Sequence, residues 1–176
     1  MTVLNRNPQN TNLLQPTKFL LTFSRAPNVQ FFCEDVNLPG LNVTETIHNT
    51  PLVDLYSPGT KLIYDYFVVT MLVDESLQSF MDIHNWLRGV APVDVAKDAI
   101  AAKTQTGPNK SKFPQFSDGV LTIMSNLNNP KLRVKFKNLY PTQLGALNFS
   151  TKDSANEIIT TSVNFRFDYY DIETLS

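Results

Sequence analysis

Apolar and polar residues alternate along two segments in the C-terminal half of the chain, and a period of two predicts β-strands. In residues 131–137, Leu132, Val134 and Phe136 occupy one set of alternate positions, and basic residues occupy the other. Residues 158–172 alternate in the same way, with apolar side chains against polar ones. Each of these strands is therefore expected to place one face in a core and the other outside it.

Four more segments have the composition of strands. Residues 18–24 and 29–36 flank a turn signal at 25–28, and we expect them to pair as a hairpin. Residues 62–73 are rich in β-branched and aromatic side chains and predict the strongest strand, and residues 119–126 predict one more.

One segment has the spacing of a helix. Asp74 and Ser76 can cap residues 77–89 at their N-terminal end. The apolar face expected from the spacing consists of Leu77, Phe80, Met81, His84 and Leu87, with Trp86 and Val90 beside it. Many strands with one good helix predict a mainly β fold, an antiparallel sandwich or barrel with one flanking α-helix.

The chain divides into an arm and one domain. Residues 1–16 are rich in Asn, Gln, Thr and Pro and predict an N-terminal arm without a core of its own. Residues 17–176 predict a single β domain, in which the polar, proline-broken stretch 91–117 is a surface insertion. Residues 41–61 are irregular for some twenty positions, and a long irregular segment in a compact domain is usually functional, so an assembly contact is expected there.

The composition excludes several functions. Charged residues make up only 18% of the 176 residues, and the net charge of -1 argues against a free-standing nucleic-acid binder. The single cysteine, Cys33, excludes an intrachain disulfide and a multi-cysteine metal site. No apolar run has the length of a signal peptide core or a membrane helix, so we expect synthesis in the cytoplasm and no membrane partner.

The chain also lacks recognisable catalytic chemistry. Its two histidines, His48 and His84, have no carboxylate or cysteine at metal-ligand spacing, and no nucleophile elbow or dinucleotide fingerprint occurs. We therefore expect no enzyme activity, no cofactor and no metal. The six tyrosines and Trp86 leave one alternative of another class, a small carbohydrate-binding β-sandwich, although Trp86 is expected near the core.

A series of short motifs in the C-terminal third resembles a known family. The residues that carry it are Leu139, Tyr140, Pro141, Thr142, Gly145 and Leu147, followed by Glu157, Ile158, Thr161, Val163, Phe165, Asp168 and Tyr169. Together they resemble the C-terminal signature of the inner tail tube proteins of contractile-tailed bacteriophages. The resemblance implies a virion protein in which six copies close a ring through a continuous inner β-barrel, and rings stack into a tube that conducts DNA without specific binding.

The same resemblance implies partners and surfaces. The partners are further copies of the chain, the tail sheath protein, and the baseplate and terminator proteins; a baseplate or neck tube initiator or adaptor of the same fold is the nearest alternative. The predicted ring-stacking residues are His48, Pro51, Asp54, Tyr56, Pro58 and Lys61. The predicted residues of the lumen or the sheath-facing surface are Arg133, Lys135, Asn164, Arg166 and Asp168, and alternation alone does not separate these two surfaces.

Overall fold

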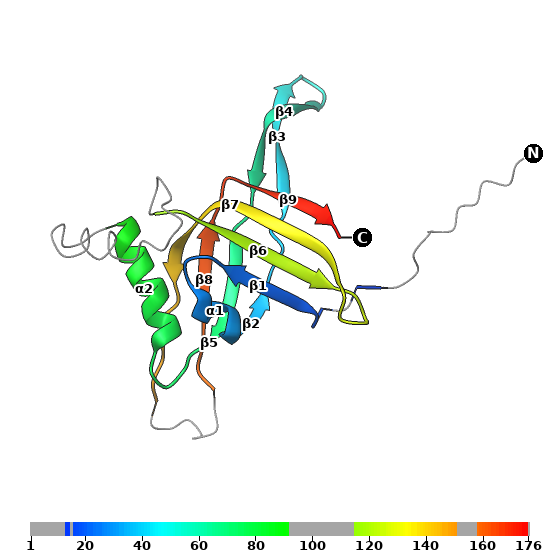
Figure 1. Cartoon of the computed structure of the whole chain (residues 1–176). Helices are drawn as coiled ribbons and strands as arrows, with labels where there is room; N and C mark the ends of the chain where they lie inside the picture. Colours follow the sequence, from blue (N-terminus) through cyan, green and yellow to red (C-terminus); the bar gives the residue numbers. More distant parts are fainter. Residues whose placement is uncertain (1–12, 15, 92–114, 151–157, 176) are drawn as a thin grey trace, which may run out of the picture.

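The computed structural model describes residues 13–14, 16–91, 115–150 and 158–175, so most of the predicted arm and most of the predicted insertion lie outside the described residues (Figure 1). The described part contains nine strands and two helices. In chain order they are β1 (Phe19–Phe23), α1 (Pro27–Phe32), β2 (Cys33–Val36), β3 (Leu41–Asn49), β4 (Asp54–Tyr64), β5 (Phe67–Leu72), α2 (Gln78–Val90), β6 (Ser117–Met124), β7 (Pro130–Leu144), β8 (Thr160–Arg166) and β9 (Tyr169–Thr174).

Seven of the strands form one antiparallel sheet that folds into two layers around the long strand β7. The N-terminal half of β7 lies between β6 and β9, and β1 pairs with β6; we call these strands the β1 layer. The C-terminal half of β7, residues 140–144, pairs with β8, which continues through β5 to β2; we call these strands the β2 layer. The prediction of a mainly β antiparallel fold with a flanking helix is confirmed.

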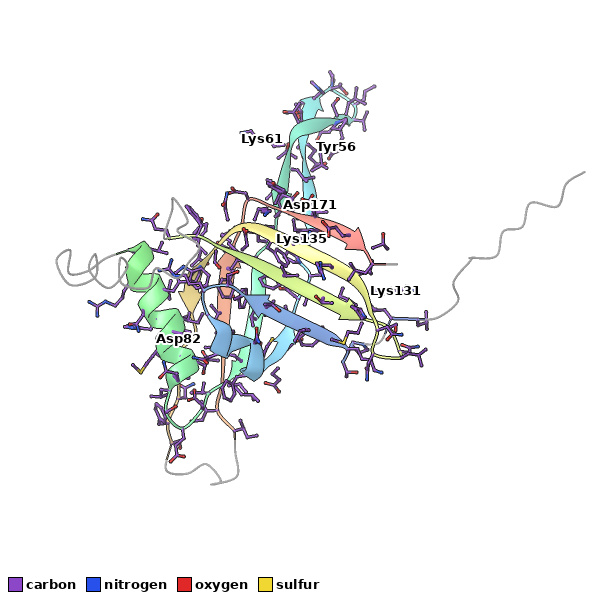
Figure 2. The ribbon with its side chains drawn as sticks, viewed as in Figure 1. Tyr56, Lys61, Asp82, Lys131, Lys135 and Asp171 are labelled. Carbon is purple, nitrogen blue, oxygen red and sulfur yellow. The ribbon has the colours of Figure 1, made fainter. Side chains whose placement is uncertain are left out.

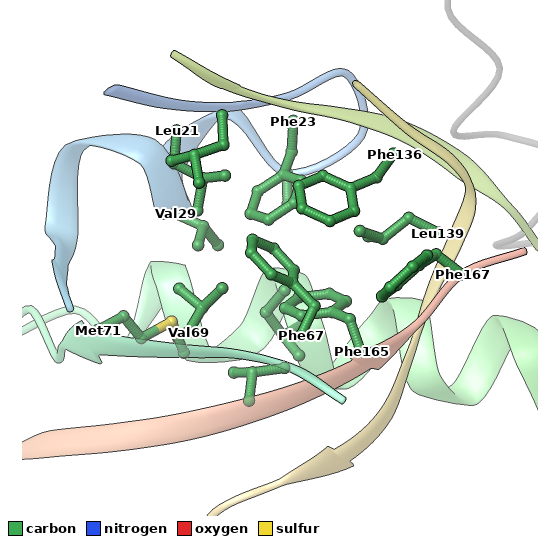
Figure 3. Packing of buried hydrophobic residues seen from close by; sticks show 14 of the residues in the cluster. Leu21, Phe23, Val29, Phe67, Val69, Met71, Phe136, Leu139, Phe165 and Phe167 are labelled. Carbon is green, nitrogen blue, oxygen red and sulfur yellow. The ribbon is translucent and has the colours of Figure 1, made fainter. Parts of the chain in front are cut away.

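The core fills the space between the two layers (Figure 3). Phe23 and Phe136 enter it from the β1 layer, and Phe67 and Phe165 enter it from the β2 layer. The Phe67 and Phe136 ring centroids are 4.4 Å apart, and those of Phe23 and Phe165 are 5.3 Å apart. Alternation predicts the inward faces of β7 and β8 correctly, since Val134, Phe136, Val163 and Phe165 are all buried.

The predicted helix exists, and its expected apolar face is right only in part. Trp86, Leu87 and Val90 pack on the core, but Met81 and His84 do not. Its buried residues are Ser79, Ile83 and Trp86, whereas Met81 is 48% exposed and His84 is exposed. The helix carries apolar side chains on two sides, and spacing alone does not tell which side the sheet covers. The N-cap residue is Leu77 and not Asp74 or Ser76. The Asp74 carboxylate nevertheless accepts the backbone N–H of Gln78 at 3.2 Å and that of Ser79 at 3.2 Å.

Two predictions about the N-terminal half are wrong. Residues 29–36 do not form one strand paired with residues 18–24, because Pro27–Phe32 is the helix α1 and only Cys33–Val36 is extended. The strand β2 then pairs with β5, not with β1. Pro27 stands at the start of α1, where a proline costs no helical hydrogen bond, so the turn signal is also a helix start signal.

The two long predicted strands are each interrupted. Residues 62–73 divide between the end of β4 at Tyr64 and the separate strand β5, and residues 158–172 divide between β8 and β9. At the first interruption the chain leaves β3 and joins β2 and β8; at the second it leaves β5 and pairs with an earlier part of β7. A local pattern does not reveal either change.

Candidate assembly surfaces

Strands β3 and β4 form a hairpin that stands out from the body of the molecule (Figure 1). They pair only with each other, in a separate two-stranded sheet. The prediction that residues 41–61 are irregular is therefore wrong, since the segment is regular β-structure. At the tip, the Thr50 hydroxyl donates to the Val53 carbonyl, and the Val53 N–H donates to Thr50 Oγ1 at 3.2 Å.

The hairpin is apolar and yet exposed. The exposed large apolar residues on it are Leu41, Val43, Ile47, Leu52, Val53, Leu55, Tyr56, Leu62 and Ile63, each at least 49% exposed. Ile47 and Tyr56 lie directly opposite each other on neighbouring strands, and Val43 lies opposite Leu62. A two-stranded hairpin is marginal alone in water, and a monomer rarely displays apolar side chains in such a concentration. This surface has the character of an interface.

All six residues predicted for ring stacking lie on the hairpin. Those six residues, His48, Pro51, Asp54, Tyr56, Pro58 and Lys61, are exposed. His48 lies opposite Leu55, and Asp54 lies opposite Asn49 beside the tip. Tyr56 and Lys61 project along the hairpin (Figure 2). The structure thus brings the six residues onto one projection.

A bulge divides the hairpin into a base and a tip. Val43 pairs with Leu62 and Glu45 pairs with Pro58, so the single residue Thr44 faces the three residues 59–61 of β4. Thr44 Oγ1 fills the gap, since it donates to the Lys61 carbonyl at 3.3 Å and accepts the Lys61 N–H at 3.4 Å. A Cβ at Gly59 would lie 2.3 Å from Thr44 Oγ1 and 2.5 Å from the Thr44 carbonyl oxygen, so only glycine fits.

Apart from the edge strand β2, the outward face of the β2 layer is almost uncharged. Across β5, β8 and residues 140–144 of β7, Arg166 is the only charged residue. The neutral polar side chains bond to their neighbours, since Asn164 Nδ2 donates to Gln143 Oε1 at 3.0 Å and Thr142 Oγ1 donates to the Asn164 carbonyl at 3.0 Å. The edge strand β2 adds Glu34 and Asp35.

The outward face of the β1 layer is charged, with both signs interleaved (Figure 2). Arg133 lies opposite Glu173, and Lys135 lies opposite Asp171. Lys135 Nζ is 2.6 Å from Glu173 Oε1, and Lys137 Nζ is 3.4 Å from Asp118 Oδ2. The basic stripe seen in the sequence is therefore offset by acidic residues of β9 and β6.

Arg166 and Asp168 lie at the junction between β8 and β9. The Arg166 guanidinium donates to the Tyr64 carbonyl at 2.8 Å and lies over the Tyr66 ring, 3.6 Å from its centroid. The Asp168 carboxylate accepts a hydrogen bond from Asn138 Nδ2. The structure therefore places both side chains in local contacts at this junction.

The described residues hold no group of three or more potential metal ligands, and no described helix is long and apolar enough to cross a membrane.

Burial raises the pKa of the Cys33 thiol to about 11, and the nearby Asp35 charge adds to the rise. Trp86 is 1% exposed and its Nε1 donates to the Gln115 carbonyl at 2.9 Å, so it is not available to stack on a sugar.

Comparison with known protein families shows which family the chain belongs to. The model of the family described as phage tail tube protein matches residues 9–173. The chain belongs to this family. It is therefore a structural, non-enzymatic tail tube protein and a component of a phage tail. The comparison with curated proteins found no match.

Solved structures share the fold of this tail tube protein at low sequence identity. A chain from the cap that terminates the tube of the anti-feeding prophage has a TM-score of 0.57 at 12% identity, covering 99% of this chain and 100% of the other. A chain from the baseplate of the same particle has a TM-score of 0.55 at 13% identity, covering 93% and 97%. A chain from the sheath–tube complex of an extracellular contractile injection system, PVC, has a TM-score of 0.53 at 9% identity, covering 94% and 94%.

Two features of this tail tube protein were missed by reasoning from its sequence. The first is the regular pairing of β3 with β4, for which the alternating pairs Ile47 with Tyr56 and Val43 with Leu62 were the available signal. The second is the engagement of Arg166 with Tyr64 and Tyr66, which no local pattern shows, because the partners are about a hundred residues apart in the chain.

Proposed function

We propose that this chain is the repeating subunit of the inner tube of a contractile phage tail, with six copies in each ring and rings stacked into a conduit for DNA. The observation that carries the proposal is the projecting hairpin β3–β4, whose exposed apolar side chains fit burial against another copy. Membership of the tail tube family supports a second copy of the chain as the occupant.

Stacking of rings accounts for the hairpin. A tube of identical rings needs a contact directed along its axis, and a projection from each subunit that reaches the next ring provides one. Pairs such as Ile47 with Tyr56 would be covered on docking, which offsets the cost of holding them in water. The six predicted stacking residues belong to this contact.

Closure of the ring accounts for the sheet edges. In the described part of the chain, the β2 layer ends at β2 on one side and at residues 140–144 of β7 on the other. An open edge invites pairing with another strand, and pairing the β2 edge of one copy with the β7 edge of the next would make the β2 layers a continuous barrel.

The two outward faces suit different surroundings. A lumen that conducts DNA must not bind phosphate, and the nearly uncharged face of the β2 layer meets this requirement. The charged face of the β1 layer, with Arg133 and Lys135, would then lie outside the tube and contact the sheath. We accordingly assign Asn164 to the lumen. Expression in the cytoplasm of the bacterial host, and contacts with baseplate and terminator proteins at the tube ends, complete the proposal.

Electron microscopy of the purified protein tests the proposal. We expect the wild-type chain to form hollow stacked tubes at high concentration, and Ile47→Asp to leave rings that no longer stack, because the new carboxylate would be desolvated in the contact. Leu127→Asp, which introduces the same charge at an exposed apolar position in the turn before β7, is the matched control and should form tubes.

The outcomes separate the alternatives. A wild-type protein that closes into single rings and never stacks would favour a baseplate or neck adaptor of the same fold. A chain that stays monomeric at every concentration, alone and with phage tail proteins, would overturn the proposal.

A further inference from the structure

The hairpin β3–β4 shares no strand ladder with the rest of the described molecule, so its direction depends on contacts at its base. The strand β3 contains 9 residues, and a strand advances about 3.3 Å per residue, so the tip lies roughly 30 Å from the base. A tilt of only 10° at the base would displace the tip by about 5 Å, more than a packed contact tolerates. Whatever fixes the base therefore fixes where the tip lies.

One leg of the hairpin is held by Arg166. This residue ends β8, in the body of the molecule. Its guanidinium donates to the Tyr64 carbonyl at 2.8 Å, where β4 ends, and the same group stacks on the Tyr66 ring with 3.6 Å between Cζ and the ring centroid. A planar guanidinium can make both contacts at once, which a lysine ammonium does not reproduce.

The end of β4 also packs against aromatic rings, and the segment before β3 accepts a hydrogen bond from the body of the molecule. The Tyr64 ring lies edge-on to the rings of Phe167 and Tyr170, with 5.3 Å between centroids in each case. The Tyr170 hydroxyl donates to the Pro39 carbonyl at 3.2 Å, just before β3 begins. Residues 166–170 thus contact the chain on both sides of the hairpin.

We propose that Arg166 and Tyr170 form a mount that sets the direction of the hairpin and so positions its tip for the neighbouring ring. The proposal rests on the proposed role of the hairpin in stacking. It gives Arg166 a positioning role in place of a contact with DNA or sheath. The mount holds a projection whose own side chains are exposed, and a fixed direction lowers the entropy lost when the tip docks.

Arg166→Lys and Tyr170→Phe test the mount with little change in volume. Arg166→Lys keeps the charge and removes the stacked, forked guanidinium, and Tyr170→Phe removes only the hydroxyl bond to Pro39. We expect each variant to keep the wild-type circular dichroism spectrum and to raise the protein concentration needed for tube formation by about tenfold. Arg133→Lys, on the charged face of the β1 layer, is the matched control and should assemble at the wild-type concentration.

A second measurement separates positioning from a general loss of stability. A Leu52→Cys and Leu127→Cys double variant, made in a Cys33→Ser background, carries one spin label on the tip and one on the body. The two labels report the tip-to-body distance in the unassembled protein. The mount predicts a broader distance distribution in Arg166→Lys than in the wild type, at an unchanged melting temperature.

Two results would overturn the mount. One is an unchanged distance distribution together with wild-type assembly in both variants; the other is a loss of assembly that follows a lowered melting temperature and not a broadened distribution. Both are distinguishable from failure of the stacking role, which would appear as normal tubes in the Ile47→Asp variant.

Discussion

Gly59 shows how one residue decides the shape of the hairpin. A Cβ there would lie 2.5 Å from a backbone oxygen of Thr44, whereas a Cβ at Gly40 would meet only the mobile end of Asp65, at 2.6 Å. We predict that Gly59→Ala distorts the bulge and prevents stacking, and that Gly40→Ala does not. Electron microscopy of both variants checks this, and tubes of wild-type length in Gly59→Ala would contradict it.

Asp74, at the N-terminal end of α2, makes the stability of the fold depend on pH. A hydrogen bond from the Ser76 hydroxyl, and further ones from the backbone N–H groups of Ser79 and Gln78 and the Ser79 hydroxyl, hold the pKa of the Asp74 carboxyl well below its usual range. Because the folded pKa is depressed, the stabilisation is present above the unfolded pKa of about 4 and is lost as the pH falls through the folded value.

We therefore predict that Asp74→Asn is less stable than the wild type at neutral pH and that the difference shrinks below about pH 4. Thermal unfolding of the two proteins between neutral and acidic pH measures this. A difference that stays constant over that range would show that the carboxylate charge plays no part.

At the scale of the element, α2 shows what a helical pattern does and does not settle. Its position was predictable from spacing and from Asp74 near its N-terminal end, but its buried face was predictable only in part, because apolar residues such as Met81 and Ile83 lie on different sides of the helix. The choice between those sides is made by the sheet, whose Phe165 ring lies 5.9 Å from the Trp86 ring.

We predict that Trp86→Ala lowers the free energy of unfolding by about 3–5 kcal/mol, because it removes a fully buried ring and the hydrogen bond to Gln115. Met81→Ala, at a half-exposed position of the same helix, should cost less than about 1 kcal/mol. Urea denaturation of both variants measures the two losses in free energy of unfolding. Equal losses would show that Met81 is as important to the core as Trp86, as the spacing predicts.

Alternation of apolar and polar residues predicts some of the strands and not others. Alternation predicted β7 and β8 because Val134, Phe136 and Phe165 pack in the core of this same chain. It failed for β3 and β4, because Ile47 and Tyr56 have no core of their own chain to alternate against. The irregular pattern led to the prediction of an assembly contact in this segment, but it concealed the regular pairing of β3 with β4.

At the scale of the whole molecule, the two outward faces differ in charge, and the proposed function assigns the nearly uncharged face to the lumen. We predict that Asn164→Lys assembles into tubes but slows DNA delivery, since a ring of added lysines would bind passing phosphates. Thr122→Lys, which adds the same charge on the β1 layer, is the control. Ejection rates measured at low and high salt check the mechanism, because added salt should relieve the Asn164→Lys defect. An equal effect of both variants would contradict the assignment of the faces.

The long strand β7 has a mechanical consequence. Its first half belongs to one layer and its second half to the other, so a single stretch of peptide bonds passes through both walls of the sandwich. A shearing load on the β1 layer is therefore passed to the β2 layer through covalent backbone as well as through side-chain packing.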